Sequence, residues 1–349
     1  MEVTTIGIDI AKRIFQIHGI DKNGKTILKK KLMRDQVLIF MANLPKALVG
    51  MEACGGANHW AREITKLGHE VKLIAPQFVK PYVKTNKNDQ ADAEAICEAV
   101  SRPSMKFVPI KSIEQQDILS IHRVRERLVK NRTALANEIR GLLLEFGLII
   151  PQGINKITVK LTEILDGGRL SQLSYKTFSD LKEEFLDNDK KIKELEKRLK
   201  QISHDNENHG KLMALPGIGL ITATALIASI GNATNFENGR QLSAWLGLVP
   251  KQHSSGGKQK LLGISKRGDV YLRNLLIHGA RSLFQSRVGA SKESNKLEKN
   301  NSKFTDWMIN LQLRRGYNTS VVAVANKLAR VVFSVLRGNQ TYNELKVCY

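Results

Sequence analysis

Two aspartates, Asp89 and Asp92, lie three residues apart at the start of the alanine-rich segment KNDQADAEA, residues 87–95. If this segment is a helix, positions i and i+3 share a face, and both carboxylates project to the same side. Such a pair repels unless protons or a cation neutralise it, and a divalent metal is the neutraliser that also does chemistry. The structural alternative is that Asn88 or Asp89 caps the helix and Asp92 lies in its first turn, where the helix dipole favours an acid.

Two further acids belong to apolar segments that have the character of strands. Asp9 lies within TTIGIDIAK (residues 4–12), and Glu52 closes ALVGME (residues 47–52). A carboxylate buried without a partner in a strand is costly, so Asp9 needs local donors or a metal, and we favour the metal. If the two strands are neighbours, their carboxylates meet. The helix that begins at Asp89 then adds two more.

Four oxygen ligands without histidine or cysteine suit Mg²⁺ or Mn²⁺. Two such cations about 4 Å apart can clamp the attacking and leaving oxygens of a phosphodiester. The sequence therefore predicts a phosphoryl-transfer site built from Asp9, Glu52, Asp89 and Asp92.

The elements that must position these acids alternate between strands and helices. Strands are expected over residues 4–12, 14–20, 25–33, 47–52 and 71–74, and helices over 36–44 and 59–67. Asn23-Gly24 is a strong hairpin signal between the second and third strands. This order predicts an α/β domain in which helices pack on a sheet.

Composition favours a nucleic-acid partner. Of the 349 residues, 55 are Lys or Arg and 33 are Asp or Glu, a net charge of +22 that suits a polyanion. The hydrophobic fraction of 42% indicates a globular chain of two or three domains. We find no run of eighteen apolar residues, no signal peptide and no paired cysteines, so we expect a cytoplasmic protein without a membrane, zinc or disulfide framework.

Basic residues precede the acidic pair directly. The segment PQFVKPYVKTNK, residues 76–87, mixes Lys80, Lys84 and Lys87 with Phe78 and Tyr82. Lysines can bind phosphates while aromatic side chains stack on bases. The plain alternative is a solvated loop, and the position next to Asp89 favours nucleic acid.

The middle of the chain, residues 111–205, predicts two long helices joined by a hinge. The first runs from Ser112 for about thirty-five residues and carries a basic stripe that includes Arg132, a candidate contact to nucleic acid. The second starts near Phe178 and has a heptad seam interrupted by Asn188. We expect an antiparallel coiled-coil arm that acts as a spacer or in dimerisation. Heptads alone leave open whether the partner helix lies in the same chain.

Residues 206–349 predict a helical domain with two glycine-containing segments. In LPGIG, residues 215–219, Gly217 and Gly219 would let backbone N–H groups reach a phosphate, or would simply permit close helix packing. In GLVPKQHSSGGK, residues 247–258, a serine in a Gly-rich loop could attack phosphorus, although a polar surface loop is the simpler reading. The residues expected to bind backbone phosphates there are Lys251, Lys258, Lys266, Arg267 and Arg273.

Taken in order, these motifs resemble a known family. GIDIAK (7–12), GMEACGGANHW (50–60) and KNDQADAEAI (87–96) resemble the three acidic blocks of the DEDD insertion-sequence transposases, the group that includes the Piv invertase. LPGIG, GLVPKQHSSGG (247–257) and GISKRGDVYLRNLLIHGARS (263–282) resemble its C-terminal transposase domain. Each motif alone is weak, whereas the ordered set covers nearly the whole chain and is highly specific.

The resemblance implies a RuvC-like, RNase H-type domain over residues 1–110 with Asp9, Glu52, Asp89 and Asp92 as metal ligands. It implies a coiled-coil dimerisation arm over 111–205, then a helical transposase domain over 206–349 with a catalytic serine. Ser255, directly before a glycine, matches that serine better than Ser254. Family members are described as forming a covalent serine–DNA intermediate, with a structured non-coding guide RNA. The acidic site of one protomer is thought to join the serine of another, in a homodimer or homotetramer.

The sequence thus predicts a Mg²⁺-dependent DNA transposase or site-specific recombinase in which Ser255 is the nucleophile. A second hypothesis is a RuvC-like junction-resolving endonuclease in which water replaces the serine. A third is a nucleic-acid-binding scaffold without catalysis, whose acids serve as caps and in salt bridges.

Overall fold

The computed structural model describes residues 2–84, 88–256, 258–289 and 303–338, so Lys87 lies outside the described residues. The chain divides into two compact units, Met1–Ile113 and Glu114–Tyr349, which we describe separately. The finer division at residues 110 and 205 stays a prediction.

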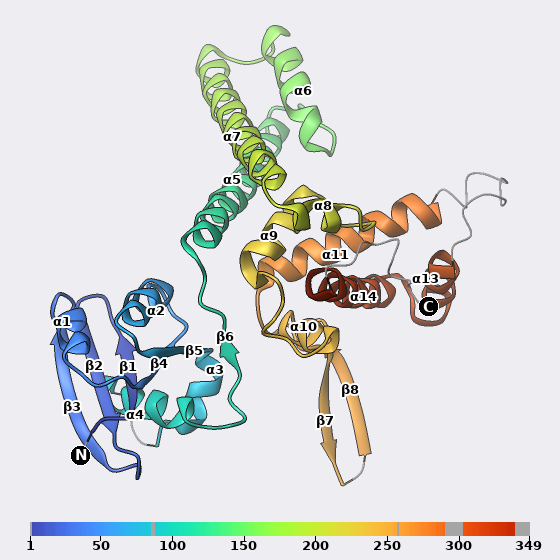
Figure 1. The fold of residues 1–349 in the computed structure, drawn as a ribbon. Coiled ribbons are helices and arrows are strands. Elements are labelled where there is room, and N and C mark those ends of the chain that lie inside the picture. Colours follow the sequence, from blue (N-terminus) through green and yellow to red (C-terminus); the bar gives the residue numbers. More distant parts are fainter. Residues whose placement is uncertain (1, 85–87, 257, 290–302, 339–349) are drawn as a thin grey trace. The chain divides into compact units, whose positions relative to one another are not determined.

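The first unit contains a mixed six-stranded sheet (Figure 1). Its strands are β1 (Thr5–Ile10), β2 (Ile14–Ile20), β3 (Thr26–Met33), β4 (Leu48–Glu52), β5 (Glu70–Ile74) and β6 (Phe107–Val108). They lie in the order β3-β2-β1-β4-β5-β6. β1, β4 and β5 are parallel to one another, and β2, β3 and β6 pair antiparallel to their neighbours. The predicted α/β character is confirmed, and the sheet is consistent with a RuvC-like domain. The two-residue strand β6 was not predicted because it is too short to show a period.

One face of this sheet packs on α1 (Gln36–Ala42) and α2 (Ala57–Lys66). Ile6 and Ile8 of β1 point to that side and are fully buried with Ile64 of α2. Short apolar strands alternate between faces, so every second residue of β1 must point the other way.

The other face is covered by α4 (Asp89–Val100), which packs unusually close to the strands. A Cβ atom added at Gly7 of β1 would lie 2.2 Å from the carbonyl oxygen of Ala93 and 2.4 Å from the backbone nitrogen of Cys97. A Cβ atom at Gly50 of β4 would lie 2.7 Å from the Cβ atom of Val100. Glycine at both positions therefore lets α4 lie directly on β1 and β4. The short α3 (Pro76–Val79) and 3₁₀ helix η1 (Lys80–Tyr82) pack beside α4.

The second unit begins with three helices, α5 (Ile113–Leu144), α6 (Ile154–Asp166) and α7 (Gln172–His204). Two ion pairs show that α5 and α7 are antiparallel partners within one chain. Arg125 Nε of α5 donates to Glu196 of α7 at 2.9 Å. About two turns further along α5, Arg132 binds Asp189 of α7. The heptad seam therefore finds a partner helix in its own chain, which the sequence had left open.

Helix α6 and the start of α7 were not predicted. The sequence indicated only a hinge before Phe178, whereas α7 begins six residues earlier, after its cap Ser171, whose hydroxyl accepts the Ser174 N–H at 3.2 Å. Helix α6 buries Ile157 and Leu161 against α5 and α7. Its apolar residues do not continue either heptad, so a search for heptads passes over it.

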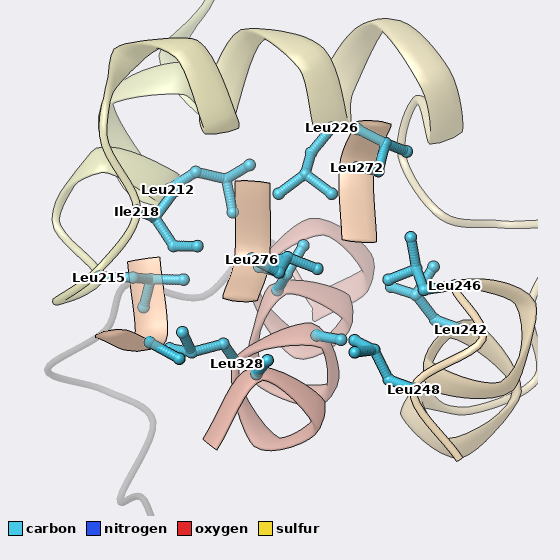
Figure 2. Close-up of a cluster of buried hydrophobic side chains, with 14 of the residues drawn as sticks. Leu212, Leu215, Ile218, Leu226, Leu242, Leu246, Leu248, Leu272, Leu276 and Leu328 are labelled. Carbon is cyan, nitrogen blue, oxygen red and sulfur yellow. The ribbon is translucent and has the colours of Figure 1, made fainter. Parts of the chain in front are cut away.

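The remaining helices share a second core. They are α8 (Glu207–Met213), α9 (Leu220–Ile230), α10 (Gly239–Trp245), α11 (Val270–Phe284) with the π-helical turn η2 (Gln285–Gly289), α13 (Lys303–Arg315) and α14 (Tyr317–Gly338). Figure 2 shows leucines of α8, α9, α10, α11 and α14 meeting, among them Leu212, Leu226 and Leu276. Within the described residues, α14 alone is long and apolar enough to cross a membrane by length and composition, and half of that stretch is buried in the protein.

The Ser/Gly-rich segment expected to be a loop forms a hairpin of β7 (Pro250–Ser255) and β8 (Lys258–Ile264). It projects from the helices of its unit (Figure 1). The sequence of these strands predicted a loop because it is polar and rich in lysine and shows no alternation of apolar and polar residues.

The close approach of α4 to β1 gives a test of the fold. Replacing Gly7 with alanine forces a methyl group into the backbone of α4, so we expect a loss of about 3 kcal/mol in stability and a clearly lower thermal midpoint. Gly141→Ala is the matched control. Its site on α5 is open, and alanine should stabilise the helix by about 0.5–1 kcal/mol. Calorimetry of both full-length variants decides, and a Gly7→Ala midpoint equal to that of the unmodified protein would contradict the packing.

Candidate active site

The strand register brings Asp9 and Glu52 to the same edge of the sheet. β1 and β4 are parallel with Ile8 opposite Met51, so the next residues along each strand, Asp9 and Glu52, are neighbours. Asp9 lies two positions after Gly7, and Glu52 lies two positions after Gly50. Both glycines contact α4. Because alternate residues of a strand point to the same side, both carboxylates are on the face that α4 covers.

The first turn of α4 supplies the other two acids. Asn88 caps this helix, since its side-chain Oδ1 accepts the Ala91 N–H at 2.8 Å. Asp89 and Asp92 are thereby left uncommitted: within the part of the chain that the structure describes, neither carboxylate forms a hydrogen bond or an ion pair. The capping alternative is confirmed, because Asn88 caps α4 and both Asp89 and Asp92 lie in its first turn, where the helix dipole favours an acid.

Electrostatics shows that the four acids belong to one cluster. The pKa of Asp9 is raised from 3.8 to about 6, first by burial and then by the charges of Asp92, Asp89 and Glu52. A hydrogen bond from the backbone N–H of Ile10 offsets this only in part. Like charges gathered beside a half-buried carboxylate make its ionised form costly, and a cation would relieve that cost.

The side chains are not yet in a coordinating arrangement. Among the described residues, no three His, Cys, Asp or Glu side chains converge closely enough to hold a metal ion. The donor set itself, four carboxylates, is the one that Mg²⁺ and Mn²⁺ prefer.

The four acids were predicted from the sequence, whereas the two glycines that let α4 lie close to the strands were not. Gly7 and Gly50 form the pattern Gly-X-acid on two adjacent parallel strands, in register. A signal was present, since both GID and GME repeat this spacing. Without the strand pairing, however, the sequence does not show that one helix lies over both glycines.

Of the lysines before α4, Lys80 is exposed in η1, and Lys84 binds Glu98 at 3.0 Å and Glu94 at 3.6 Å. The Lys84 side chain is still 64% exposed, and exposed ion pairs of this kind contribute little, so phosphate can compete for it.

Two residues expected to contact nucleic acid, Arg132 and Gly217, have structural roles. Arg132 is engaged with Asp189 between α5 and α7. Gly217 has a φ of +85° and packs against α11, where an added Cβ would lie 3.0 Å from the Gly279 carbonyl oxygen, so the close-packing alternative applies to it. Gly219 differs, because it precedes α9 with open space around it.

The prediction that Arg273 binds a phosphate must be corrected. It was expected to bind phosphate, but its side chain is buried and its guanidinium donates to the carbonyl oxygens of Leu246 at 3.2 Å and Arg267 at 3.1 Å. A guanidinium used in this way holds the chain segment and does not face solvent. The neighbouring Lys266 and Arg267 are exposed, and Lys266 takes a φ of +54° that turns the chain sharply.

The hairpin separates the two candidate serines. Ser254 Oγ accepts a hydrogen bond from Gln252 Nε2 at 2.8 Å, while Ser255 is the last residue of β7 and pairs with Lys258 of β8. Lys251 and Lys258 are exposed on this hairpin.

Two transposase family models match this chain, one in its N-terminal part and one in its C-terminal part. Residues 6–147 match the model of a transposase family with a DEDD domain, and residues 209–294 match that of the "Transposase IS116/IS110/IS902 family". A probable family 20 transposase of Pseudomonas aeruginosa is 48% identical, with 98% of this chain and 99% of that protein covered. The transposase for insertion sequence element IS1111A of Coxiella burnetii is 46% identical, over 98% of this chain and 92% of that protein.

A more distant relative has a different name. The pilin gene-inverting protein of Moraxella bovis is 22% identical over 99% of both chains. The identity to the two transposases extends over almost the full length, through the acidic cluster, the long helices and the hairpin. The chain therefore belongs to the IS116/IS110/IS902 family of transposases.

Proposed function

We propose that this protein is a DNA transposase or site-specific recombinase that cleaves and rejoins the strands of an insertion sequence. The observation that carries the proposal is the cluster of Asp9, Glu52, Asp89 and Asp92, in which burial and then the charges of the other three acids raise the pKa of Asp9 to about 6. The names of the relatives, transposases and a pilin gene-inverting protein, agree with it, because transposition and inversion both require cutting and joining DNA.

The four carboxylates are proposed to hold Mg²⁺ or Mn²⁺. Bound there, the metal supplies positive charge that polarises the scissile phosphate and helps to deprotonate the nucleophile. Asp9 is half-buried, and the charges of the other three acids act on it. Asp89 and Asp92 come from the helix start and Glu52 from the adjacent strand, so ligands arrive from three elements held together by the packing at Gly7 and Gly50.

Ser255 is the proposed nucleophile. Its oxygen forms a bond to phosphorus, the bond from phosphorus to one DNA oxygen breaks, the serine proton goes to solvent, and the leaving oxygen takes up a proton. One phosphodiester is exchanged for another, so the strand can be rejoined without ATP. Support comes from its position at the end of β7, beside Gly256, and from the engagement of the Ser254 hydroxyl with Gln252.

The partners follow from charge and family. DNA is the proposed substrate of a chain with a net charge of +22, and the exposed Lys80, Lys84, Lys251 and Lys258 are proposed phosphate contacts together with Lys266 and Arg267. A structured non-coding guide RNA, a homodimer or homotetramer, and a cytoplasmic location complete the proposal. The antiparallel α5–α7 pair is its proposed dimerisation arm.

The serine role is tested by trapping. Ser255→Ala should abolish covalent protein–DNA adducts, detected after denaturation, and recombination, while DNA binding stays within about twofold of the unmodified protein. Ser254→Ala is the matched control and should retain adducts. Adducts that persist in Ser255→Ala and vanish in Ser254→Ala would show that Ser254 is the nucleophile. Strand cleavage without any adduct in the unmodified protein would favour the hydrolytic, water-using alternative.

The acidic cluster is tested by stability against pH. The folded-state pKa of Asp9 lies above its unfolded value, so its favourable contribution is complete below pH 3.8 and is lost as pH rises through about 6. At pH 7.5 without divalent metal, Asp9→Asn should therefore be more stable than the unmodified protein. A two-unit shift corresponds to roughly 3 kcal/mol, and solvent screening at this half-exposed site reduces the expected gain to about 1 kcal/mol.

Thermal scans at pH 4 and pH 7.5, with chelator or with Mg²⁺, measure this. The stability gain should vanish at pH 4, and Mg²⁺ should stabilise the unmodified protein but not Asp9→Asn, which should also be inactive. Asp166→Asn, at an exposed position on α6, is the control and should change nothing. Equal Mg²⁺ stabilisation of Asp9→Asn would contradict the ligand role.

A further inference from the structure

A pocket of about 570 Å³ lies on the side of the sheet that packs on α1 and α2, at the end of the strands that carries Asp9 and Glu52 on the opposite face. The segment after β1 and the segment after β3 form one side of it, and they are held together by the Arg34 N–H, which donates to the Arg13 carbonyl oxygen at 2.9 Å. The start of α2 forms the other side. Its lining residues are Arg13, Met33, Arg34, Asp35, Leu38, His59 and Trp60.

The chain connectivity ties this pocket to the acids. Arg13 follows Asp9 by four residues, so their Cα atoms are at most about 14 Å apart. His59 follows Glu52 by seven residues, through the segment Cys54-Gly55-Gly56 that leads into α2. Ile14 pairs with Met33 in the antiparallel register, which brings the end of β3 to this same edge.

The pocket has the chemistry of an anion site. Two guanidiniums line it, and within the described residues neither Arg13 nor Arg34 forms an ion pair. Arg34 is held with its guanidinium 5.0 Å from the ring centroid of Trp60, which is buried edge-on against Phe15. An arginine fork on a fixed base matches the oxygens of a phosphate, and the carboxylate of Asp35 offsets only part of this charge.

The N-terminus of α2 adds to the positive electrostatic potential of the pocket. Gly56 has a φ of +88°, no side chain caps the helix among the described residues, and its first turn carries no acid. The Ala57 N–H already donates to the Cys54 carbonyl oxygen at 3.3 Å. The dipole of α2 nevertheless favours an anion close to His59, the third residue of the helix. Two arginines, neither in an ion pair within the described part of the chain, and the start of α2 thus border one pocket.

We propose that this pocket binds a backbone phosphate of the DNA strand whose scissile phosphate lies at the acidic cluster. The inference rests on the proposed function and adds a substrate contact to it. At a rise of 3.4 Å per nucleotide, the limit of about 14 Å corresponds to about four nucleotides. Four carboxylates repel a polyanion. Positively charged arginines near them reduce this repulsion and so let the DNA strand approach the acids.

Arg13 gives the sharpest test, because its side chain is exposed and its hydrogen bond with Arg34 involves only its backbone carbonyl oxygen. Arg13→Glu in the full-length protein should weaken binding of a 40-base-pair duplex by about five- to tenfold at 100 mM salt. It should also lower the slope of log K against log salt concentration by about one. Arg13→Lys should keep most of the affinity, and the thermal midpoint should not change.

Lys22→Glu is the matched control, with the same charge change at an exposed position in the β2–β3 turn at the opposite edge of the sheet. It should bind DNA as the unmodified protein does. Equal affinities and salt slopes for Arg13→Glu and Lys22→Glu, with the unmodified protein binding normally, would overturn the pocket assignment and leave the proposed function standing. A loss confined to structured RNA would also overturn it. Absence of DNA binding by the unmodified protein would instead refute the proposed function, and the pocket assignment with it.

Discussion

The fold of the first unit depends on the close packing of α4 against β1 and β4. Two glycines remove the side chains that would separate the helix from the sheet, and the backbone of α4 takes their place. The first turn of α4, which carries Asp89 and Asp92, is thereby held next to the strand ends at Asp9 and Glu52. Four like charges do not gather spontaneously, so packing on the apolar remainder of α4 must hold them there.

This arrangement explains why a basic chain contains an acidic centre. The repulsion is strongest at Asp9, whose half-buried carboxylate has its pKa raised by burial and by its three neighbours. A polyanionic substrate would be repelled by such a centre without compensation. We propose that positive groups around it, including the guanidiniums of Arg13 and Arg34, provide that compensation, and a divalent cation would complete it.

Much of this could be predicted from the sequence because the signals were local. Strands around Asp9 and Glu52 followed from β-branched residues and turn signals, and the acid pair of α4 followed from its spacing of three. The register of β1 and β4 could not be predicted, since it depends on which strands pair. The roles of Gly7 and Gly50 were missed for the same reason.

Other features were hidden because composition gives no sign of them. The hairpin of β7 and β8 has polar strands without a buried face, so it resembled a loop. Arg273 resembled its exposed basic neighbours, and only the fold shows that two carbonyl oxygens bind its guanidinium in the interior. Helix α6 has its own apolar stripe, which the search for heptads did not follow.

The central claim is that Asp9, Glu52, Asp89 and Asp92 form one cation site, and Mn²⁺ located by anomalous diffraction in crystals of the full-length protein tests it most directly. The account predicts an anomalous peak bounded by these four residues, with carboxylate oxygens of Asp9 and at least two of the others at about 2.0–2.2 Å. The peak should be absent from crystals of Asp9→Asn. A Mn²⁺ ion bound elsewhere in the chain, with none at this cluster, would contradict it.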